Sequence, residues 1–268
     1  MVNYPNAKIN LGLYITAKRT DGFHEIASCF YPIKWEEALE IIPSKAFNFS
    51  ASGIPVPGEI SSNLIVKAYQ LLQSKHNLPP VSIHLHKSLP MGAGLGGGSS
   101  DASHTLKLLN SIFDLNLSQE TLLEYSAQLG SDCAFFIYNN PCIASGRGEI
   151  LTPFSLSLKG YYLLLIHPGI HISTSEAYAG VTPRSLTIPL ENILNQAPEF
   201  WKDKLINQFE EHLFKQLPEL ATIKKQLYDM GAAYASMSGS GSAMYGIFKE
   251  KPVDFMWPEH YKTKLIEL

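Results

Sequence analysis

With 268 residues, the chain is long enough for one large domain or two smaller ones, and it can bury a sizeable core without disulfide or metal support. Its formal net charge of −3 and the lack of any run of Lys and Arg argue against a nucleic-acid or membrane-surface partner and favour a small molecule. The three cysteines are odd in number and fit no usual metal-ligand spacing, which predicts reduced thiols in a cytoplasmic protein. The longest apolar run, residues 161–166, is too short to span a bilayer, so no membrane anchor is expected.

The first predicted element is a hairpin. Apolar and polar residues alternate from Lys8 to Thr16, which is the pattern of a half-buried strand with Lys8 and Asn10 on its polar face. Asp21-Gly22 supplies a turn that tolerates positive φ, and residues 23–33 are expected to return as a second strand.

A helix and a strand are predicted before the glycine-rich segment. Apolar residues recur at helical spacing over residues 64–72, with Ser62 as the expected N-cap and Leu78-Pro79-Pro80 as the stop. Alternation over residues 81–86 then predicts a strand that runs into the glycine-rich segment 90–101.

Two helices are predicted after that segment. One carries a stripe from Ala102 to Phe113, and the other runs from Ser118 to Leu129 with Gly130 as its stop. Residues 139–148 have the composition of a loop.

The second half of the chain is expected to form a separate domain. A buried strand is predicted over residues 161–166, which sets a boundary near Ser157 and gives domains 1–156 and 157–268. Pro218 and Gly231 bracket a predicted helix, and residues 235–248 have the pattern of a strand, a glycine turn and another strand.

The glycine-rich segment is the strongest functional signal. Five glycines between residues 92 and 98 allow successive backbone N–H groups to face one point, and the helix that begins near Ser99 adds the positive end of its dipole. The segment therefore predicts a phosphate site, the alternative being a linker or a tight turn without a ligand.

Two familiar phosphate loops do not fit this segment. A Walker A loop is excluded because no lysine occurs between Met91 and Lys107. Residues 92–97 match the dinucleotide pattern, and Asp114 lies about 20 residues after Gly94, as that pattern requires. Asp114, however, follows a predicted helix, whereas the dinucleotide fold places its acidic residue at the end of a second parallel strand.

Residues 90–102 resemble the phosphate loop of the GHMP kinases. Three further blocks resemble that family in the same order, namely residues 7–11 with 21–25, residues 130–136 and residues 237–242. The resemblance covers almost the whole chain and is weakest over residues 182–219. It implies an α+β fold of two domains, a nucleotide-binding domain followed by a smaller α+β domain, with the active site in the cleft between them.

The family resemblance also implies an enzyme, an ATP-dependent kinase that phosphorylates an alcohol group of a small molecule. Its ATP-binding residues would be Pro90, Met91, Gly92, Ala93, Gly94, Leu95, Gly96, Gly97, Gly98, Ser99 and Ser100, with Asn63 on the adenine side. Helix capping is an equally good role for Asn63. Mg²⁺ is implied by the ATP chemistry, but no compact carboxylate cluster identifies its ligands. Ser99 or Ser100 is a candidate ligand, since hydroxyls at the end of such loops often bind the ion.

Lys8 and Asp132 match the catalytic pair of the family. A lysine can stabilise developing negative charge, and an aspartate can accept or orient the proton of a hydroxyl. Read without the family, Lys8 would be an ordinary surface lysine and Asp132 a helix cap. Asn10 is expected to bind substrate, its alternative being a solvent-facing strand residue. Ala134 replaces the proline that is common after the catalytic aspartate, which leaves the local backbone less restricted.

The triple glycine is typical of the GHMP branch that acts on cytidine-diphosphate-linked methylerythritol. The branch implies phosphorylation of the 2-hydroxyl of that polyol, in the non-mevalonate route to isoprenoid precursors. Phe23, His24 and Tyr178 match its cytosine pocket, although the family usually has tyrosine at the position of Phe23. Gly239 and Ser240 are expected to approach the substrate phosphates. The alternatives are core aromatics, a structural histidine and a plain hairpin turn.

Three rival functions remain open from the sequence. The first is a GHMP kinase that acts on mevalonate, homoserine or a sugar, and the triple glycine and the Phe23-His24 pair argue against it. A non-catalytic nucleotide-binding sensor would not need both Lys8 and Asp132. A nicotinamide-dependent dehydrogenase would need the dinucleotide fold that the position of Asp114 argues against.

Overall fold

The computed structural model describes residues 1–253 and 256–268, which divide into two compact units. The first unit contains residues 1–7, 34–91 and 96–140, and the second contains residues 8–33, 92–95 and 141–268. The chain therefore passes from one unit to the other several times, and the domain boundary near Ser157 stays a prediction. No helix in the described residues has the length and apolar character needed to cross a membrane.

A four-stranded sheet forms one layer of the first unit. Its strands, in spatial order, are β1 (Val2–Asn3), β4 (Ala38–Pro43), β6 (Val81–Lys87) and β5 (Asn48–Gly53). Only β5 is parallel to its neighbour. Leu39 lies opposite Leu85 and Ile41 opposite Ile83, so one face of the sheet is apolar.

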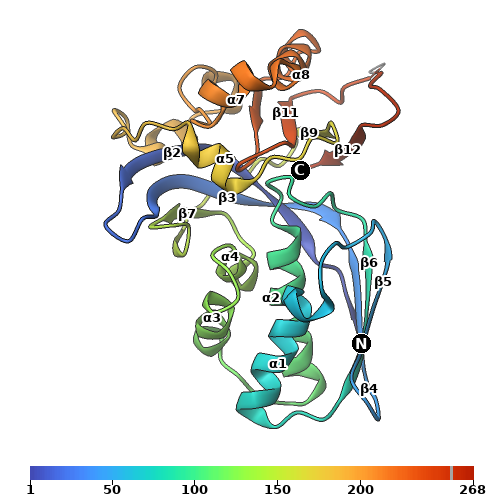
Figure 1. Ribbon diagram of the computed structural model, residues 1–268. Coiled ribbons are helices and arrows are strands. Elements are labelled where there is room, and N and C mark those ends of the chain that lie inside the picture. The colour runs from blue at the N-terminus through green and yellow to red at the C-terminus, as the bar shows by residue number, and fades with distance from the viewer. Residues whose placement is uncertain (254–255) are drawn as a thin grey trace. The chain divides into compact units, whose positions relative to one another are not determined.

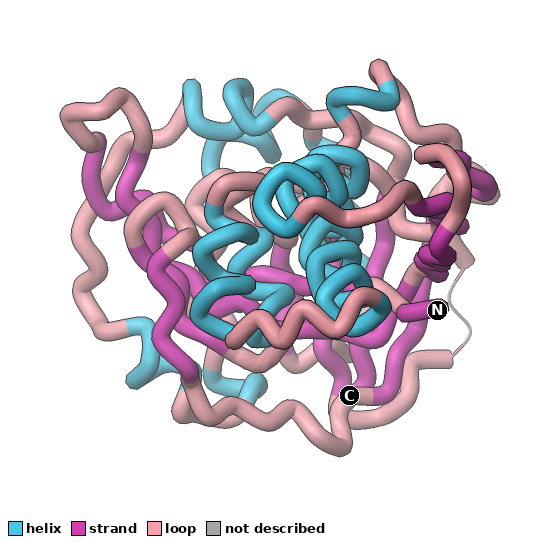
Figure 2. Tube along the Cα trace, turned by 90° about the horizontal axis from the view of Figure 1, so that it is seen from below, coloured by secondary structure: helices cyan, strands magenta, loops and turns pink. Residues whose placement is uncertain are grey.

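Helices cover that apolar face. The helical elements of this unit are η1 (Ile60–Ser62), α1 (Leu64–His76), α2 (Gly97–Ile112), α3 (Gln119–Ala127) and α4 (Cys133–Tyr138). They run side by side, as Figures 1 and 2 show. Leu72 of α1 and Leu106 of α2 belong to the same buried cluster as Ile41 and Ile83. Burial of this cluster holds α2, and with it the end of the glycine loop, on the sheet.

The second unit is built on two sheets. One has the order β2 (Asn6–Lys18), β3 (His24–Glu36), β7 (Cys142–Ser145), β8 (Ile150–Pro153), and its longest strands begin or end in the first unit. The other has the order β10 (Tyr234–Met237), β11 (Met244–Phe248), β9 (Tyr162–His167), β12 (Lys262–Glu267). The helical elements are α5 (Thr174–Ala179), α6 (Leu190–Leu194), η2 (Pro198–Phe200), α7 (Glu210–Gln216) and α8 (Pro218–Asp229).

The predicted opening hairpin is confirmed as β2 and β3, but β2 is not half-buried. All of residues 6–15 are buried, including Lys8 and Asn10. The prediction that Lys8 and Asn10 lie on an exposed polar face is wrong, because these side chains make hydrogen bonds inside the protein and do not face solvent.

Two boundaries and one loop differ from the predictions. Asn63, not Ser62, caps α1, since its side chain accepts the N–H of Ile65 at 2.9 Å. Helix α3 ends at Ala127 with Gln128 as its C-cap, so Gly130 is not its stop. The loop predicted over residues 139–148 contains β7, a strand of only four residues whose flanking Asn, Pro and Gly dominate the local composition.

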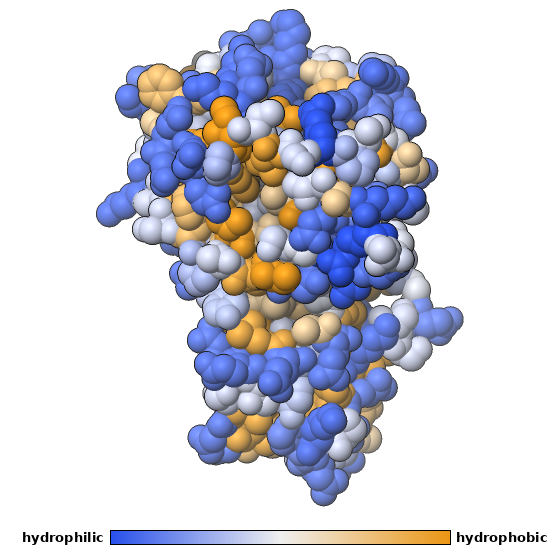
Figure 3. Space-filling model, turned by 90° about the vertical axis from the view of Figure 1, so that its left-hand side faces the viewer, coloured by the Kyte–Doolittle hydropathy of each residue, from blue (hydrophilic) through white to orange (hydrophobic). Residues whose placement is uncertain are grey.

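Hydrophilic residues cover most of the face drawn in Figure 3, with apolar residues between them. Most of the large apolar side chains are in the interior, and Phe23 is one of the exposed exceptions, at 54%. An exposed aromatic side chain next to a turn is available to contact a ligand.

Candidate active site

The glycine loop has the backbone that a phosphate site requires. Gly92, Gly94 and Gly96 have φ angles of +63°, +76° and +72°, so alternate residues of the loop lie in the left-handed region. Gly96 is the N-cap of α2, and the N–H groups in the first turn of a helix have no acceptor within that helix. These groups and the helix dipole attract an anion, which supports the predicted phosphate site.

Glycine is favoured at residue 97 for a different reason. It is the first residue of α2, and its φ is not positive. A Cβ at this position would lie 3.2 Å from the Nζ of Lys87 and 3.4 Å from the Cδ1 of Leu89. Close packing against Lys87, and not an unusual φ, therefore favours glycine here.

The second glycine turn, residues 238–242, lies against the middle of the glycine loop. The hydroxyl of Ser238 donates to the carbonyl of Gly94 at 2.9 Å, and the N–H of Ala243 donates to the carbonyl of Ala93 at 3.2 Å. A Cβ at Gly94 would overlap the carbonyl oxygen of Ser238, so only glycine allows this approach. The structure thus brings two of the predicted binding segments together within the second unit.

Lys8 is buried in β2, which excludes the alternative of an ordinary surface lysine. Its Nζ donates to the Oδ1 of Asn10 at 2.6 Å and lies 4.8 Å from the centre of the Phe30 ring. The Nδ2 of Asn10 donates to the Oγ of Ser28 at 2.9 Å. Asn10 therefore orients the ammonium group and is not the solvent-facing residue of the alternative interpretation.

The loop is tied to the same strand. The N–H of Lys8 donates to the carbonyl of Leu95 at 3.0 Å, and the N–H of Asn10 donates to the Oγ of Ser238 at 3.3 Å. Both glycine segments consequently make hydrogen bonds to the strand that carries Lys8.

Asp132 occupies the N-cap position of α4 but makes no capping hydrogen bond with its side chain. Its carboxylate is thus not used as an ordinary helix cap, which was the alternative interpretation. Ala134 is in the first turn of α4, so the backbone after Asp132 is helical without the proline of the family. Cys133 is buried, and burial raises the pKa of its thiol to about 11, with a smaller rise from Asp132.

A buried charge cluster lies at the two ends of the glycine loop, within the first unit. Lys87, the last residue of β6, donates from Nζ to Glu37 at 2.6 Å and to Asp101 of α2 at 2.9 Å. The other oxygen of Glu37 accepts the N–H groups of Ser88 and Leu89, at 3.0 and 2.8 Å. Glu37 therefore holds the entry to the loop, and Asp101 holds the helix that follows it.

Burial and opposite charge set the protonation of this cluster. Burial lowers the pKa of Lys87, but Asp101 and Glu37 outweigh burial and raise it overall. Burial raises the pKa of Asp101 well above its ordinary value and Glu37 adds to the rise, against the opposing effect of Lys87. A protonated Asp101 leaves one ammonium and one carboxylate, which is a neutral group of charges and less costly to bury.

Aromatic rings gather around His24 in the second unit. The His24 ring stacks on Tyr178 with a centroid distance of 4.9 Å and an angle of 22° between planes. Phe209 meets Tyr178 edge-on at 4.9 Å and 78°. Phe23 contacts the guanidinium group of Arg147, 4.8 Å from its ring centre. His24 and Tyr178 are therefore in direct contact, whereas the Phe23 ring contacts Arg147 and is otherwise largely exposed.

The predicted site residues are divided between the two units. The first unit holds Asn63, Pro90, Met91, Gly96, Gly97, Gly98, Ser99, Ser100 and Asp132. The second unit holds Lys8, Asn10, Phe23, His24, Gly92, Ala93, Gly94, Leu95, Tyr178, Gly239 and Ser240.

Sequence analysis missed several polar residues around these segments. Ser28 and Glu37 lie on β3 or just after it, where neither hydropathy nor spacing distinguishes them from neighbouring residues. The position of Lys87 was a usable signal. It ends an alternating strand shortly before the glycine loop, so its ammonium group could reach either end of the loop. Asn207 and Glu210 fall where the family resemblance is weakest.

Known proteins identify the family. The GHMP kinases N-terminal domain matches residues 63–140, and the GHMP kinases C-terminal domain matches residues 190–259. A 4-diphosphocytidyl-2-C-methyl-D-erythritol kinase of Cytophaga hutchinsonii is 51% identical over 256 residues, which cover 95% of each chain.

Solved structures agree with this assignment. The crystal structure of a 4-(cytidine 5'-diphospho)-2C-methyl-D-erythritol kinase has a TM-score of 0.80 and 31% identity, covering 92% of this chain and 90% of the other. The mevalonate kinase of Methanococcus jannaschii has a TM-score of 0.72 but only 13% identity, covering 100% of this chain and 98% of the other, so it shows the shared fold alone. The chain belongs to the GHMP kinase family of ATP-dependent small-molecule kinases, in the branch of the 4-diphosphocytidyl-2-C-methyl-D-erythritol kinases.

Proposed function

We propose that this chain transfers the γ-phosphoryl group of ATP to the 2-hydroxyl of 4-diphosphocytidyl-2-C-methyl-D-erythritol. The observation that carries the proposal is 51% identity over 95% of the chain to a kinase named for this substrate. The buried Lys8, the glycine loop and the aromatic contact of His24 with Tyr178 support it. We place the reaction in the cytoplasm, a proposal supported by an odd number of cysteines, all of them buried.

In the proposed reaction the glycine loop and the first turn of α2 bind the ATP phosphates through backbone N–H groups. Lys8, held by Asn10, stabilises the negative charge of the moving phosphoryl group. Asp132 orients the 2-hydroxyl and accepts its proton as the new O–P bond forms and the bond to the β-phosphate breaks, which releases ADP.

The cytidine end would be bound by the aromatic residues. Tyr178 offers a ring face on which a base can stack, and the His24 imidazole already lies against that ring. A pyrimidine stacked beside the imidazole would have its polar edge next to the ring nitrogens of His24. Gly239 and Ser240 would receive the diphosphate through backbone N–H groups.

Mg²⁺ would be held mainly by the ATP phosphates. Among the described residues no three His, Cys, Asp or Glu side chains come together as metal ligands. The Oγ of Ser100 is buried without a hydrogen-bond partner in the described part of the chain, so its oxygen fits the part of a single protein ligand. When bound, the ion would neutralise phosphate charge.

The experiment is an ATP-consumption assay with three acceptors at equal concentration, namely the cytidine-diphosphate polyol, mevalonate and homoserine. We expect ATP-dependent phosphorylation of the cytidine-diphosphate polyol and no significant turnover of the other two. Preferred turnover of mevalonate or homoserine would replace the proposed substrate. ATP binding without turnover of any acceptor would favour a non-catalytic sensor.

A further inference from the structure

One short segment of the second unit, residues 206–210, contacts both the glycine turn and the aromatic residues. It runs beside β2, since the N–H of Leu13 donates to the carbonyl of Ile206 and the N–H of Gln208 donates to the carbonyl of Leu13, both at 2.8 Å. The segment is thereby fixed along the strand that carries Lys8 and Asn10.

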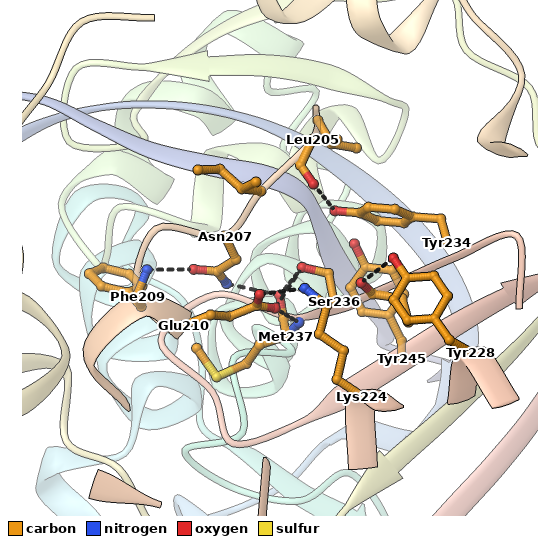
Figure 4. Close-up of polar contacts among 12 residues, drawn as sticks. Leu205, Asn207, Phe209, Glu210, Lys224, Tyr228, Tyr234, Ser236, Met237 and Tyr245 are labelled. Carbon is orange, nitrogen blue, oxygen red and sulfur yellow. Dashed lines mark hydrogen bonds and ion pairs between the residues drawn. The ribbon is translucent and has the colours of Figure 1, made fainter. Parts of the chain in front are cut away.

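Asn207 holds the glycine turn. Its side chain is buried, and its Nδ2 donates to the carbonyl of Met237 at 2.8 Å (Figure 4). The same Nδ2 donates to the carbonyl of Gly239, also at 2.8 Å. Its Oδ1 accepts the N–H of Phe209 at 3.0 Å. One bond goes to the turn itself and the other to the last residue of β10, directly before the turn, so these bonds determine the orientation of the amide.

The bond to Gly239 also sets the direction of Ser240. The C=O and N–H groups of a trans peptide point in opposite directions. With the Gly239 carbonyl turned toward Asn207, the N–H of Ser240 points away from Asn207. Gly239 and Gly241 have φ angles of +56° and +85°, which glycine adopts freely, so this peptide plane depends on an outside contact such as Asn207.

Glu210, the last residue of the segment and the first of α7, binds the end of strand β10. One oxygen of its carboxylate accepts the N–H of Met237 at 2.7 Å and the hydroxyl of Ser236 at 3.1 Å. Its other oxygen accepts Lys224 of α8 at 2.5 Å, as Figure 4 shows. Met237 is thus bound through its carbonyl by Asn207 and through its N–H by Glu210.

Phe209 extends the contacts of the segment to the aromatic residues. Its ring is buried and meets Tyr178 edge-on, while Tyr178 stacks on His24. An edge-on contact of this kind restricts the rotation of the Tyr178 ring.

We infer that Asn207 and Phe209 are positioning residues for the cytidine-diphosphate end of the substrate. Asn207 aims the Ser240 N–H at the diphosphate, and Phe209 fixes the Tyr178 ring on which the base stacks. The inference rests on the proposed function, because it takes its ligand from that proposal. It adds residues that act through the glycine turn and the aromatic ring.

The test compares Asn207→Ala with Gln208→Ala as a matched control. Gln208 is a buried amide in the same segment, but it bonds Ile15 at 2.8 Å and Thr182 at 2.7 Å, not the glycine turn. The melting temperature, kcat and the KM for each substrate are measured on the full chain. We expect both variants to lose thermal stability. Asn207→Ala should raise the KM for the cytidine-diphosphate polyol by about tenfold or more, whereas its KM for ATP should change less than about twofold.

Phe209→Leu is the second variant and keeps the proposal testable if Asn207→Ala does not fold. It should raise the KM for the polyol about fivefold or more and leave the KM for ATP unchanged. If the folded variants keep the wild-type KM for the polyol, or if both KM values rise together, the inference is overturned. If the wild type phosphorylates the polyol and the variants keep its KM for the polyol, the inference is overturned and the proposed function stands. If the wild type does not phosphorylate the polyol, the proposed function is overturned as well.

Discussion

At the scale of single residues, Lys8 shows how burial gives a polar side chain one defined position. Its ammonium donates to the amide oxygen of Asn10, and that amide is in turn held by Ser28. The amide oxygen of Asn10 thus fixes the direction of the ammonium group, which is what a group that stabilises a moving phosphoryl charge requires. This chain of contacts comes from β2 and β3, which are paired strands, and is therefore rigid.

The first prediction concerns Asp132. Asp132→Asn should lower kcat by at least about a hundredfold, because an amide cannot accept the proton of the hydroxyl. ATP affinity should stay the same, since the nucleotide is assigned to the glycine loop. Steady-state kinetics together with calorimetric titration of ATP check both statements. Near-normal turnover of the variant would remove Asp132 from the reaction.

The second prediction concerns Tyr178. Tyr178→Ala should cost about 1–3 kcal/mol of cytidine-substrate binding, or roughly 5- to 150-fold in affinity, which is the usual value of one base–aromatic stack. ATP affinity should barely change. Tyr178→Phe keeps the ring and is the matched control, so it should bind nearly as the wild type does. A lower melting temperature with intact affinity would instead assign Tyr178 to the core.

At the scale of elements, the cluster of Glu37, Lys87 and Asp101 connects β6, the end of β3 and α2. Glu37 binds the backbone just before the glycine loop, and Asp101 lies in the helix just after it. The loop between them has three residues with positive φ and little stiffness of its own. Its shape therefore depends on the two ends that the cluster holds.

The third prediction follows from the protonation of this cluster. Burial raises the pKa of the Asp101 carboxyl, which favours its neutral form. Asp101→Asn puts a neutral amide of the same shape in its place, so the free energy of unfolding should stay within about 1 kcal/mol of the wild type. Glu37→Gln removes the charge partner of a buried ammonium and should cost about 3–5 kcal/mol, with a higher KM for ATP. Urea unfolding and ATP kinetics of both variants make the comparison. Equal damage in the two would show that Asp101 is ionised in the folded protein.

The sequence predicted long elements with a clear period and missed short ones. Helices α1, α2 and α8 and the strands β6 and β9 follow from periodicity, because each buries one stripe, one face or a continuous apolar run. Alternation also predicted the strand β2, but not the burial of both its faces. Strand β7 has four residues between Asn, Pro and Gly, so its pairing with β3, a tertiary contact, decides its structure.

The candidate site was predictable only in part. The glycine segments, Lys8 and Asp132 could be found because their residue types recur at fixed places in a recognisable family. Asn207 and Phe209 could not, since their roles come from contacts with residues 30 positions or more away in the chain. No local pattern records such contacts.

At the scale of the whole molecule, the buried ionisable groups make stability depend on pH in opposite directions. Asp101 has a raised pKa in the folded protein, so the folded state holds a proton that the unfolded state releases. Asp101 therefore lowers the stability as the pH rises from its pKa in the unfolded chain toward its pKa in the folded protein. His104 of α2 has a lowered pKa, so the unfolded state binds the extra proton as the pH falls.

The last prediction isolates His104. Its imidazole is buried, neither ring nitrogen has a hydrogen-bond partner within the described residues, and burial lowers its pKa from 6.5 to about 4, with a smaller effect from Lys107. Well above pH 6.5 the imidazole is neutral in both states, so its protonation makes no contribution to stability there. As the pH falls toward 4, only the unfolded state is protonated, and the protein should lose about 3 kcal/mol in total, of which about 2 kcal/mol is lost by pH 5.

His104→Met has a side chain of similar volume that does not titrate, and His104→Gln is polar and does not titrate either. Urea unfolding of the wild type and both variants at pH 7.5 and pH 5 separates the histidine from all other groups, since those groups are common to the three proteins. Both variants should gain about 2 kcal/mol relative to the wild type on going to the lower pH, whatever the cost of each change at pH 7.5. A pH dependence that is the same in all three proteins would mean that His104 becomes protonated in the folded state near its ordinary pKa, and that water or an acceptor reaches its ring.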